Sequence, residues 1–565
     1  MKLSHHRFPL LELVVMLSGI VLLPFSTFAQ NHQAETLAAK VDKIFANWDK
    51  PTSPGCALGV IKDGQLIYKR GYGMADLDHD IPITSASVFH VASVSKQFTA
   101  MAIHLLAKQG KLSLDDEVKK YITELPDFGH KITIRHLLHH TSGLRDQWSL
   151  LVMAGWRLSE DVVRDEDILE LVSRQKDLNF KPGDQFLYCN TGYTLLAIIV
   201  KRVSGKSLRE FAAENIFKSL GMNNTFFRDD HAVIVKNQAY GYVPAANNTF
   251  KFNVPNYDTV GASSLLTTIE DLVKWDQNFY DYQVGGNDVI TQMQTTTTLN
   301  NGDKFPYTHG LAVGNYKGLK IVEHSGADAG YRSHLMRFPE QKFSVACLCN
   351  LASTNPGMLA RQVADVYLAD LLKPEAAKPV AEIKGVTLTE EQLKLKIGAY
   401  WNPSAEDFAK VTLSNGKLYF AGGTSSELIA LSENRFQMKV QPAEVRFEPG
   451  ADGRLQMIVN IEGRKPILFT QMEAMNPTAD ELKEYAGAFY SDELDATYRI
   501  EIQDGKLFLK RKKYPAASFM TAFKDAFINI QLGTLRFTRD AQKRINGLII
   551  GSGRIRNMRF VKQAQ

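Results

Sequence analysis

The spacing of apolar residues after position 93 predicts a helix with one buried face. Apolar side chains recur there every three or four positions, the period that places them on one side of a helix. The pattern runs to about Lys108, and Gly110 beyond it is the residue type that commonly ends a helix. Ser93 is therefore expected at the start of a helix packed into a core. The buried face consists of Phe98, Met101, Ala102, Leu105 and Leu106.

Strand patterns occur at both ends of the first 370 residues. Residues 56–61 and 65–69 are strand-like, and the Lys62-Asp63-Gly64 turn between them predicts a hairpin. Residues 310–350 again predict strands, whereas residues 147–180 and 190–203 have helical spacing. We therefore expect an α+β domain in which one antiparallel sheet is built from sequence-distant strands, with a helical lobe against it.

The last third of the chain repeats itself with an offset of 89 or 90 residues. Each copy is led by a short helical stretch and continues with short strands separated by glycine turns. Two small β-barrel-like (lipocalin-like) repeats fit this pattern better than one large domain. The clearest matched pair of segments is Gly398-Ala399-Tyr400-Trp401 and Gly487-Ala488-Phe489-Tyr490.

The first 29 residues resemble a secretory signal peptide. A basic start is followed by an uncharged apolar segment from Leu13 to Phe25, and Thr27-Phe28-Ala29 places small residues at the cleavage positions. The apolar segment is shorter than the roughly 20 residues that span a bilayer. We expect an exported bacterial protein, periplasmic or secreted, with an uncleaved membrane anchor as the alternative.

These patterns divide the chain into five expected segments. They are a signal peptide over 1–29, an α+β domain over 30–371, a linker rich in proline and lysine over 372–384, and two barrel repeats over 385–474 and 475–565.

Composition narrows the class of protein. With 44% hydrophobic and 22% charged residues, the chain can bury large cores. Its net charge of +5 is too small and too dispersed to indicate a nucleic-acid partner. The four cysteines lack the paired spacing of a metal site. Cys56, Cys347 and Cys349 lie in apolar strands, so we expect buried thiols instead of a disulfide framework.

Ser93 and Lys96 are the first candidates for chemistry. Residues three apart on a helix share a face. An ammonium buried beside a hydroxyl shifts toward the neutral amine, a base able to take the serine proton. Ser-x-x-Lys also arises by chance, as a capping serine followed by a surface lysine, so the assignment needs partners. His139 and His140, near Ser142, have the wrong spacing for a local triad and are expected to hold a loop.

Two later motifs supply these partners. Tyr188-Cys189-Asn190 precedes a predicted helix, and His324-Ser325-Gly326 lies on a predicted strand. With Ser93-Val94-Ser95-Lys96, in this order, they resemble the three motifs of the penicillin-binding and class C β-lactamase-like serine hydrolases. The resemblance covers about residues 35–370. It implies a β-lactamase/transpeptidase-like catalytic domain that uses neither a cofactor nor a metal.

The resemblance also implies residue roles. Ser93 would attack a carbonyl and become an acyl-enzyme, while Lys96 and Tyr188 would share the proton transfers. A tyrosine near two cations is expected to titrate well below its usual pKa of about 10. Cys189 stands where the family has serine, and its side chain is expected to point away from the site. The implied substrate-binding residues are Asn190, His324, Ser325, Gly326 and Ala327.

His324 is the main departure from the penicillin-recognising members, which carry lysine there. A histidine is largely neutral at pH 7, so carboxylate recognition should be weaker. His-x-Gly resembles the D-aminopeptidase-like and esterase-like branches, and D-aminopeptidase-like members carry extra β-barrel domains. Glu323 and Asp328 are acidic neighbours, and Arg332 is the one nearby candidate for binding an anion. These neighbours favour a substrate with a free amine.

The expected function is hydrolysis of amide or ester bonds of small peptides, with D-amino-acid-containing peptides favoured. A carboxylesterase or β-lactamase of the same family is an alternative. From another class, a catalytically silent penicillin-binding-like sensor would use the same pocket, but the intact Ser93, Lys96 and Tyr188 favour an enzyme. The expected partner is a small peptide or ester, with no nucleic acid. Membrane association is expected only if the N-terminal segment is uncleaved.

Overall fold

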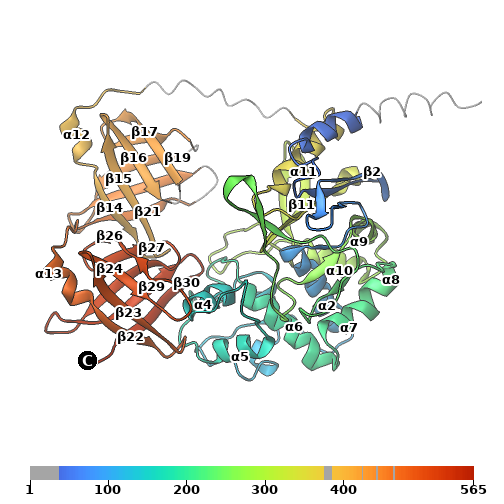
Figure 1. Ribbon diagram of the computed structural model, residues 1–565, viewed down its shortest axis with the longest axis horizontal. Coiled ribbons are helices and arrows are strands. Elements are labelled where there is room, and N and C mark those ends of the chain that lie inside the picture. Colours follow the sequence, from blue (N-terminus) through green and yellow to red (C-terminus); the bar gives the residue numbers. More distant parts are fainter. Residues whose placement is uncertain (1–36, 374–384, 423, 441–442, 462–464, 565) are drawn as a thin grey trace, which may run out of the picture.

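The structure, a computed structural model, describes residues 37–373, 385–422, 424–440, 443–461 and 465–564. The expected signal peptide and most of the expected linker lie outside these residues. Figure 1 shows an α+β body on one side and two stacked β-barrels on the other. Within the described ranges, the helices are all too short or too polar to cross a membrane.

A six-stranded antiparallel sheet forms the centre of the α+β body. Its order, β10-β11-β12-β13-β1-β2, joins strands from both ends of the domain, as the sequence predicts. The predicted hairpin is β1 and β2, and β1 pairs with β13 along its whole length. The strands are β1 (Cys56–Lys62), β2 (Gln65–Tyr72), β10 (Ala312–Tyr316), β11 (Leu319–Asp328), β12 (Tyr331–Phe338) and β13 (Phe343–Cys349).

Helices cover both faces of this sheet. α11 and a helix that includes residues 37–45 pack on one face, and the helical lobe with α2 at its centre packs on the other. The helices of the domain are α2 (Lys96–Lys108), α3 (Ile134–Leu138), α4 (Gln147–Met153), α5 (Asp165–Ser173), α6 (Asn190–Ser204), α7 (Leu208–Ala212), α8 (Lys218–Leu220), α9 (Ile269–Asp281), α10 (Gly286–Met293) and α11 (Pro356–Tyr367).

Short strands brace the loops around α2. The three-stranded sheet β5-β9-β6 lies immediately before and beside the start of this helix. Two further pairs, β3-β4 and β7-β8, complete the domain. Their bounds are β3 (Met74–Asp76), β4 (Ile81–Pro82), β5 (Phe89–His90), β6 (Phe226–Phe227), β7 (Tyr242–Pro244), β8 (Phe250–Phe252) and β9 (Leu265–Thr267).

The repeated C-terminal segments form two barrel-like sheets. The first closes through β14 and β21 and is preceded by α12 (Glu390–Lys394). Its strands are β14 (Gly398–Asn402), β15 (Asp407–Ser414), β16 (Lys417–Gly422), β17 (Thr424–Ser432), β18 (Arg435–Met438), β19 (Ala443–Pro449), β20 (Leu455–Ile461) and β21 (Ile467–Met472).

The second barrel is a nine-stranded sheet preceded by α13 (Ala479–Leu482), and β22 lies 89 residues after β14, the offset of the sequence repeat. Its strands are β22 (Gly487–Ser491), β23 (Ala496–Gln503), β24 (Lys506–Lys510), β25 (Ala517–Ser518), β26 (Met520–Phe523), β27 (Ala526–Asn529), β28 (Gly533–Arg539), β29 (Ile545–Ser552) and β30 (Ile555–Lys562).

The second barrel packs directly against the helical lobe, beside α4 and α5 (Figure 1). Its apolar core is continuous with that of the α+β domain. A fully buried ion pair joins Arg145 of the lobe to Glu493 of the barrel at 2.6 Å. The hydroxyl of Tyr498 donates to the carbonyl of Met153, at the end of α4, over 2.7 Å. These contacts fix the barrel against the wall of the candidate site.

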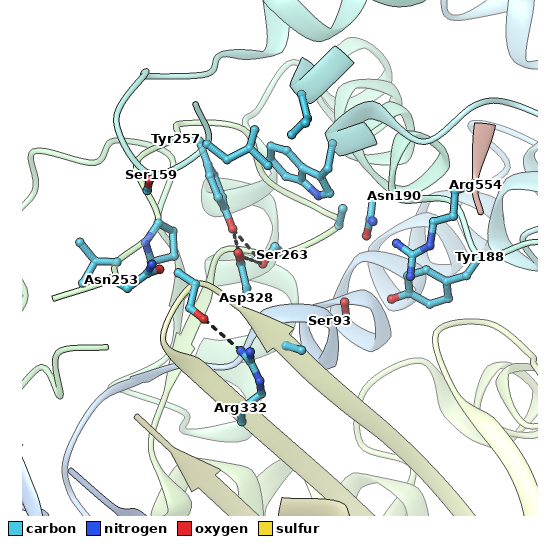
Figure 2. Close-up of a pocket in the computed structure, with 18 of the residues that line it drawn as sticks. Ser93, Ser159, Tyr188, Asn190, Asn253, Tyr257, Ser263, Asp328, Arg332 and Arg554 are labelled. Atoms are coloured by element: carbon cyan, nitrogen blue, oxygen red, sulfur yellow. Dashed lines mark hydrogen bonds between the residues drawn. The ribbon is translucent and has the colours of Figure 1, made fainter. Parts of the chain in front are cut away.

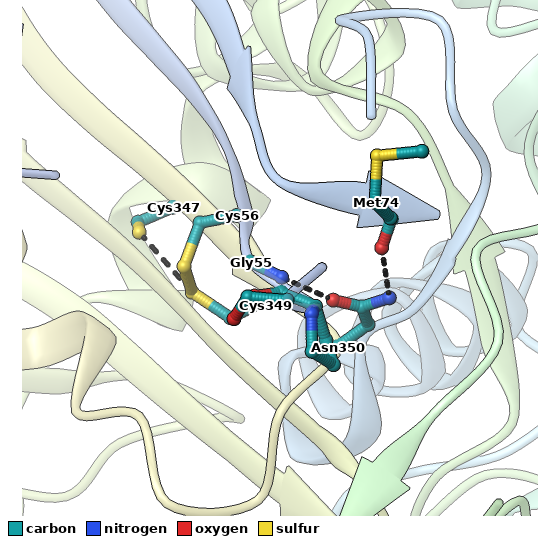
Figure 3. Close-up of a disulfide and its surroundings, with 8 residues drawn as sticks. Gly55, Cys56, Met74, Cys347, Cys349 and Asn350 are labelled. Carbon is teal, nitrogen blue, oxygen red and sulfur yellow. Dashed lines mark hydrogen bonds between the residues drawn. A yellow bond between two sulfur atoms is a disulfide. The ribbon is translucent and has the colours of Figure 1, made fainter. Parts of the chain in front are cut away.

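The cysteine prediction is wrong at one pair. Cys56 and Cys349 stand directly opposite each other on β1 and β13 and form a disulfide (Figure 3). The cross-strand register that brings the two sulfurs together joins residues 293 apart in sequence, so no local pattern reveals it. Cys347 is a buried thiol 3.7 Å from Cys349, as predicted, and Cys189 is a buried thiol as well.

Three buried histidines form a hydrogen-bonded chain beneath the sheet edge. His139 Nδ1 donates to the carbonyl of Tyr307, which leaves its Nε2 as an acceptor. His309 therefore donates through Nε2 to His139 at 2.9 Å and accepts through Nδ1 from His104 at 2.7 Å. This arrangement requires His139 and His309 to be neutral, because each accepts a hydrogen bond through a ring nitrogen. His139 thus belongs to a structural network, in agreement with its predicted role in holding a loop.

These histidines predict a loss of stability in acid. In the unfolded chain each takes up a proton near pH 6.5, whereas burial lowers the pKa of His104 and of His139 to about 4 in the folded state. Their contribution to stability is therefore complete above pH 6.5. It decreases by roughly 3 kcal/mol per pH unit as the pH falls toward 4. Thermal unfolding between pH 7.5 and 5 measures this slope.

A variant separates this effect from other acid-sensitive groups. His104→Asn removes one of the titrating groups of this cluster, so its stability should fall less steeply with decreasing pH than that of the wild type. His79→Asn is the matched control, because His79 is exposed and bonded only to a local aspartate. An unchanged slope in His104→Asn would contradict the account, whatever the variant's stability at neutral pH.

Candidate active site

Ser93 is held on a rigid 3₁₀ turn, Ala92–Ser95, immediately before α2. Ala92 has φ of +48°, a strained conformation for a residue with a side chain. The turn is fixed by Ser95, whose buried Oγ donates to the carbonyl of Ala92 and accepts from the amide of Leu265. The sequence-predicted helix start is therefore confirmed, with a 3₁₀ turn at the serine.

Gly326 lets strand β11 approach this turn closely. A Cβ at position 326 would lie 2.3 Å from the carbonyl oxygen of Val91 and 3.1 Å from the Cβ of Ala92. Any larger residue would push the strand away from Ser93. The close packing thus explains why the third residue of His-x-Gly is a glycine. The same packing places Ala327 in the pocket beside the serine.

Lys96 is completely buried and points at Ser93. Its Nζ donates to Ser93 Oγ at 3.1 Å, to Asn190 Oδ1 at 2.9 Å and to the carbonyl of Ala262 at 2.6 Å. Burial lowers the pKa of the Lys96 ammonium to about 7, a shift opposed by Asp146 and reinforced by Arg554. A large fraction of this amine is therefore neutral at physiological pH.

Asp146 supports this arrangement and was not found from the sequence. It is buried, and its Oδ2 accepts from both the backbone amide and Nδ2 of Asn190, at 2.7 and 2.8 Å. The amide oxygen of Asn190 is thereby turned toward Lys96. Asp146 also caps the N-terminus of α4 through Trp148. An aspartate preceding a helical pattern was the available signal, but it indicated only a cap.

Tyr188 lies beside the serine, with its hydroxyl directed toward Ser93 (Figure 2). The hydroxyl oxygen is buried and has no hydrogen-bond partner among the described residues. Lys96 Nζ lies 4.8 Å from the centre of its ring. The expected low pKa is wrong: burial raises the pKa of Tyr188 above its usual value, because desolvation outweighs the lowering effects of the Ser93 hydroxyl and the Arg554 guanidinium. The phenol is therefore protonated at neutral pH.

His324 is neutral, in a fixed tautomer. Its Nδ1 donates to the carbonyl of Ser325 at 2.7 Å, so its Nε2 accepts from the hydroxyl of Tyr307 at 2.9 Å. Burial lowers the pKa of His324 to about 3. The side chain contributes to the pocket wall without charging near pH 6.5. Ser325 is exposed to the same pocket and bonded to His334 at 2.8 Å.

One pocket of about 1150 Å³, large enough for a short peptide, is bordered by Ser93, Tyr188, Asn190, His324, Ser325 and Ala327, whereas Lys96, Asp146 and Gly326 lie behind its lining. The second barrel contributes part of its wall, which the sequence did not predict. Arg554 reaches from the barrel to lie over Tyr188 in Figure 2. Cys189 is buried outside this lining, as expected. The charged residues of the pocket include Glu160, Glu323, Asp328, Arg332 and Lys513.

A serine activated by a buried amine, on this fold, defines a serine hydrolase. A family model described as Beta-lactamase matches residues 41–369, and the chain belongs to that family.

Its relatives extend into the barrels. Penicillin-binding protein 4* of Bacillus subtilis is 30% identical over 417 residues, 71% of this chain and 91% of that protein. A D-aminopeptidase of Brucella anthropi is 25% identical over 526 residues, 88% of this chain and 93% of that enzyme. The structure of an octameric penicillin-binding protein homologue from Pyrococcus abyssi superposes with a TM-score of 0.55 at 25% identity, covering 77% of this chain and 99% of that one.

Proposed function

We propose that the chain hydrolyses amide bonds of small D-amino-acid-containing peptides through an acyl-enzyme on Ser93. The observation that carries this proposal is the buried Lys96 amine, 3.1 Å from Ser93 Oγ and held on its other sides by Asn190 and Ala262. A neutral amine in this position takes the serine proton as the oxygen attacks.

The remaining groups take part in the two steps of the reaction, formation of the acyl-enzyme and its hydrolysis. The Tyr188 phenol, which keeps its proton at neutral pH, donates to the leaving amine and is reprotonated from Lys96. The backbone N–H groups of Ser93 and Ala327 are the proposed donors to the oxyanion, a pair brought together by the close packing at Gly326. Water then hydrolyses the acyl-enzyme with the same groups working in reverse.

The preference for D-residues is supported by the relatives. D-aminopeptidases match along most of this chain, barrels included. The same site chemistry serves esters, so a carboxylesterase is the second candidate within the family. We also propose export, which the Cys56–Cys349 disulfide supports because disulfides persist mainly in oxidising compartments.

A matched substrate panel tests the proposal. D- and L-aminoacyl nitroanilides, short acyl esters and nitrocefin are compared on one preparation by kcat/KM. We expect the D-aminoacyl amides to be hydrolysed faster than their L-enantiomers, which share the same leaving group. A preference for esters or nitrocefin would favour the other members of the family. No turnover and no labelling by a fluorophosphonate would favour the silent sensor.

A further inference from the structure

The turn between β29 and β30 projects one cation into the active site. Gly553 and Arg554 form its tip, and Gly553 has φ of +46°. Asn179 of the catalytic domain clamps the turn from both sides: its Nδ2 donates to the carbonyl of Arg554 at 2.9 Å, and its Oδ1 accepts from the amide of Arg556 at 2.8 Å. Arg145 donates to the carbonyls of Arg556 and Asn557. Arg554 is therefore presented by a fixed backbone.

The guanidinium of Arg554 has N–H groups that are free to bind a ligand. It lies 4.9 Å from the centre of the Tyr188 ring, and its side chain is 44% exposed, facing the pocket. Asp146 is its one carboxylate neighbour in the described ranges, at 3.7 Å. That carboxylate oxygen already accepts two shorter hydrogen bonds from Asn190. Within the described chain, this guanidinium donates no hydrogen bond of its own.

The acidic groups of the pocket, by contrast, are already engaged. Glu323 accepts from Arg361 and from His334, and Glu160 pairs with Arg157. Asp328 accepts from three neutral or histidine donors, His90, Tyr257 and Ser263.

Arg554 and Arg332, by contrast, keep guanidinium N–H groups that make no side-chain hydrogen bond among the described residues. Lys513 is paired with Asp161, but Arg332 donates only to the backbone carbonyls of Ala329 and Tyr331 among the described residues. The sequence analysis expected Glu323 and Asp328 to favour a free amine, but both carboxylates already accept hydrogen bonds within the protein. The unused guanidinium donors favour a substrate that carries an anion.

The position of Arg554 indicates which end of the substrate is anionic. The acyl carbon must lie at Ser93 Oγ, and the amine that leaves must lie at the Tyr188 hydroxyl that protonates it. A cation stacked beside the Tyr188 ring is therefore on the leaving-group side. In an α-amino acid leaving group, the carboxylate is two bonds from the departing nitrogen, within reach of such a cation.

We propose that Arg554 binds the free C-terminal carboxylate of the substrate, so that the second barrel makes the enzyme select short peptides ending in an uncapped residue. The inference rests on the proposed amide hydrolysis and adds its leaving-group specificity. Under this proposal the substrate carboxylate contacts Arg554, 230 positions after His324 in the sequence. His324 itself stays neutral. Because a guanidinium is charged at all accessible pH values, the selectivity should not depend on pH.

Two substrates that differ only in this charge provide the test. D-alanyl-D-alanine and D-alanyl-D-alaninamide share the acyl part, and mass spectrometry follows their cleavage. The wild type should prefer the free carboxylate by about 10- to 100-fold in kcat/KM, as a hydrogen-bonded charge contact provides. Arg554→Ala should reduce this ratio to near 1. If Arg554→Ala also altered the pKa of Lys96, the rates for the two substrates would change together and their ratio would stay the same.

Arg556→Ala is the matched control, because Arg556 lies on the same turn but bonds Gln185 outside the pocket. It should keep the wild-type preference. A wild-type ratio near 1, or an unchanged ratio in Arg554→Ala, would overturn the carboxylate contact while leaving amide hydrolysis intact. A ratio that rises as the pH falls below 6.5 would assign the contact to a histidine. Cleavage of neither compound, together with unlabelled Ser93, would overturn the proposed function itself.

Discussion

Ser93→Ala is expected to lower kcat by about 10⁶-fold, the size of the loss when a catalytic serine is removed from other serine hydrolases. The side chain is the proposed nucleophile, and its Oγ accepts one hydrogen bond from Lys96. The variant should fold normally, because the bonds that fix the turn belong to Ser95. Steady-state hydrolysis of a D-aminoacyl nitroanilide measures the loss.

Ser95→Ala is the matched comparison on the same turn. Its hydroxyl is buried and bonded to the backbone on both sides, so its removal should lower the thermal midpoint while Ser93 still reacts with a fluorophosphonate. Turnover by Ser93→Ala at more than a trace of the wild-type rate would mean that another residue is the nucleophile.

Lys96→Ala is expected to reduce kcat/KM by about 10²- to 10⁴-fold, the usual contribution of a positioned proton-transfer group. In the wild type the neutral amine is the base, and burial lowers the pKa of Lys96 to about 7. The rate should therefore increase as the pH rises through about 7 and level off above it. This limb of the pH profile should be missing in the variant.

Lys108→Ala controls for the loss of a lysine from the same helix. Lys108 is exposed at the end of α2 and pairs with Asp288. Its replacement should leave both the rate and the pH profile unchanged. A Lys96→Ala enzyme that keeps the same rise near pH 7 would show that a different group supplies the base.

Local sequence signals were sufficient for the elements that carry the motifs. The hairpin of β1 and β2 follows from alternation and a glycine turn, and the start of α2 follows from its apolar period. The barrel repeat was visible because both copies keep matched turns. The hairpin, the helix and the turns within each barrel copy all depend on neighbours within about 20 residues, where pattern and structure are closely coupled.

The sequence led to the expected shift of Lys96 and to a neutral His324, but not to the charge state of Tyr188. Whether Tyr188 is ionised depends on the balance between burial and nearby cations, and burial is a property of the assembled fold. Burial also lowers the pKa of His324, which Tyr307 and the backbone hold in a single tautomer. Arg554 enters the pocket only because the second barrel docks on the helical lobe. Contacts of this kind join segments hundreds of residues apart.

Docking of the second barrel gives the repeats different positions in the molecule. The second copy contributes Arg554 and Lys513 to the pocket, whereas the described residues of the first copy do not line it. Glu406 of the first barrel instead pairs with Arg536 of the second and accepts from the amide of Asn557. The first barrel therefore supports the turn that presents Arg554, and its loss should affect the pocket indirectly.

The most direct test of the account is the identification of the acylated residue by peptide mass spectrometry. The wild-type protein is quenched in acid during turnover of a D-aminoacyl ester, digested, and compared with Ser93→Ala treated in the same way. The account predicts a mass increase equal to the acyl group on the peptide containing Ser93, and none in the variant. An acyl group on another residue, or the same adduct in Ser93→Ala, would contradict it.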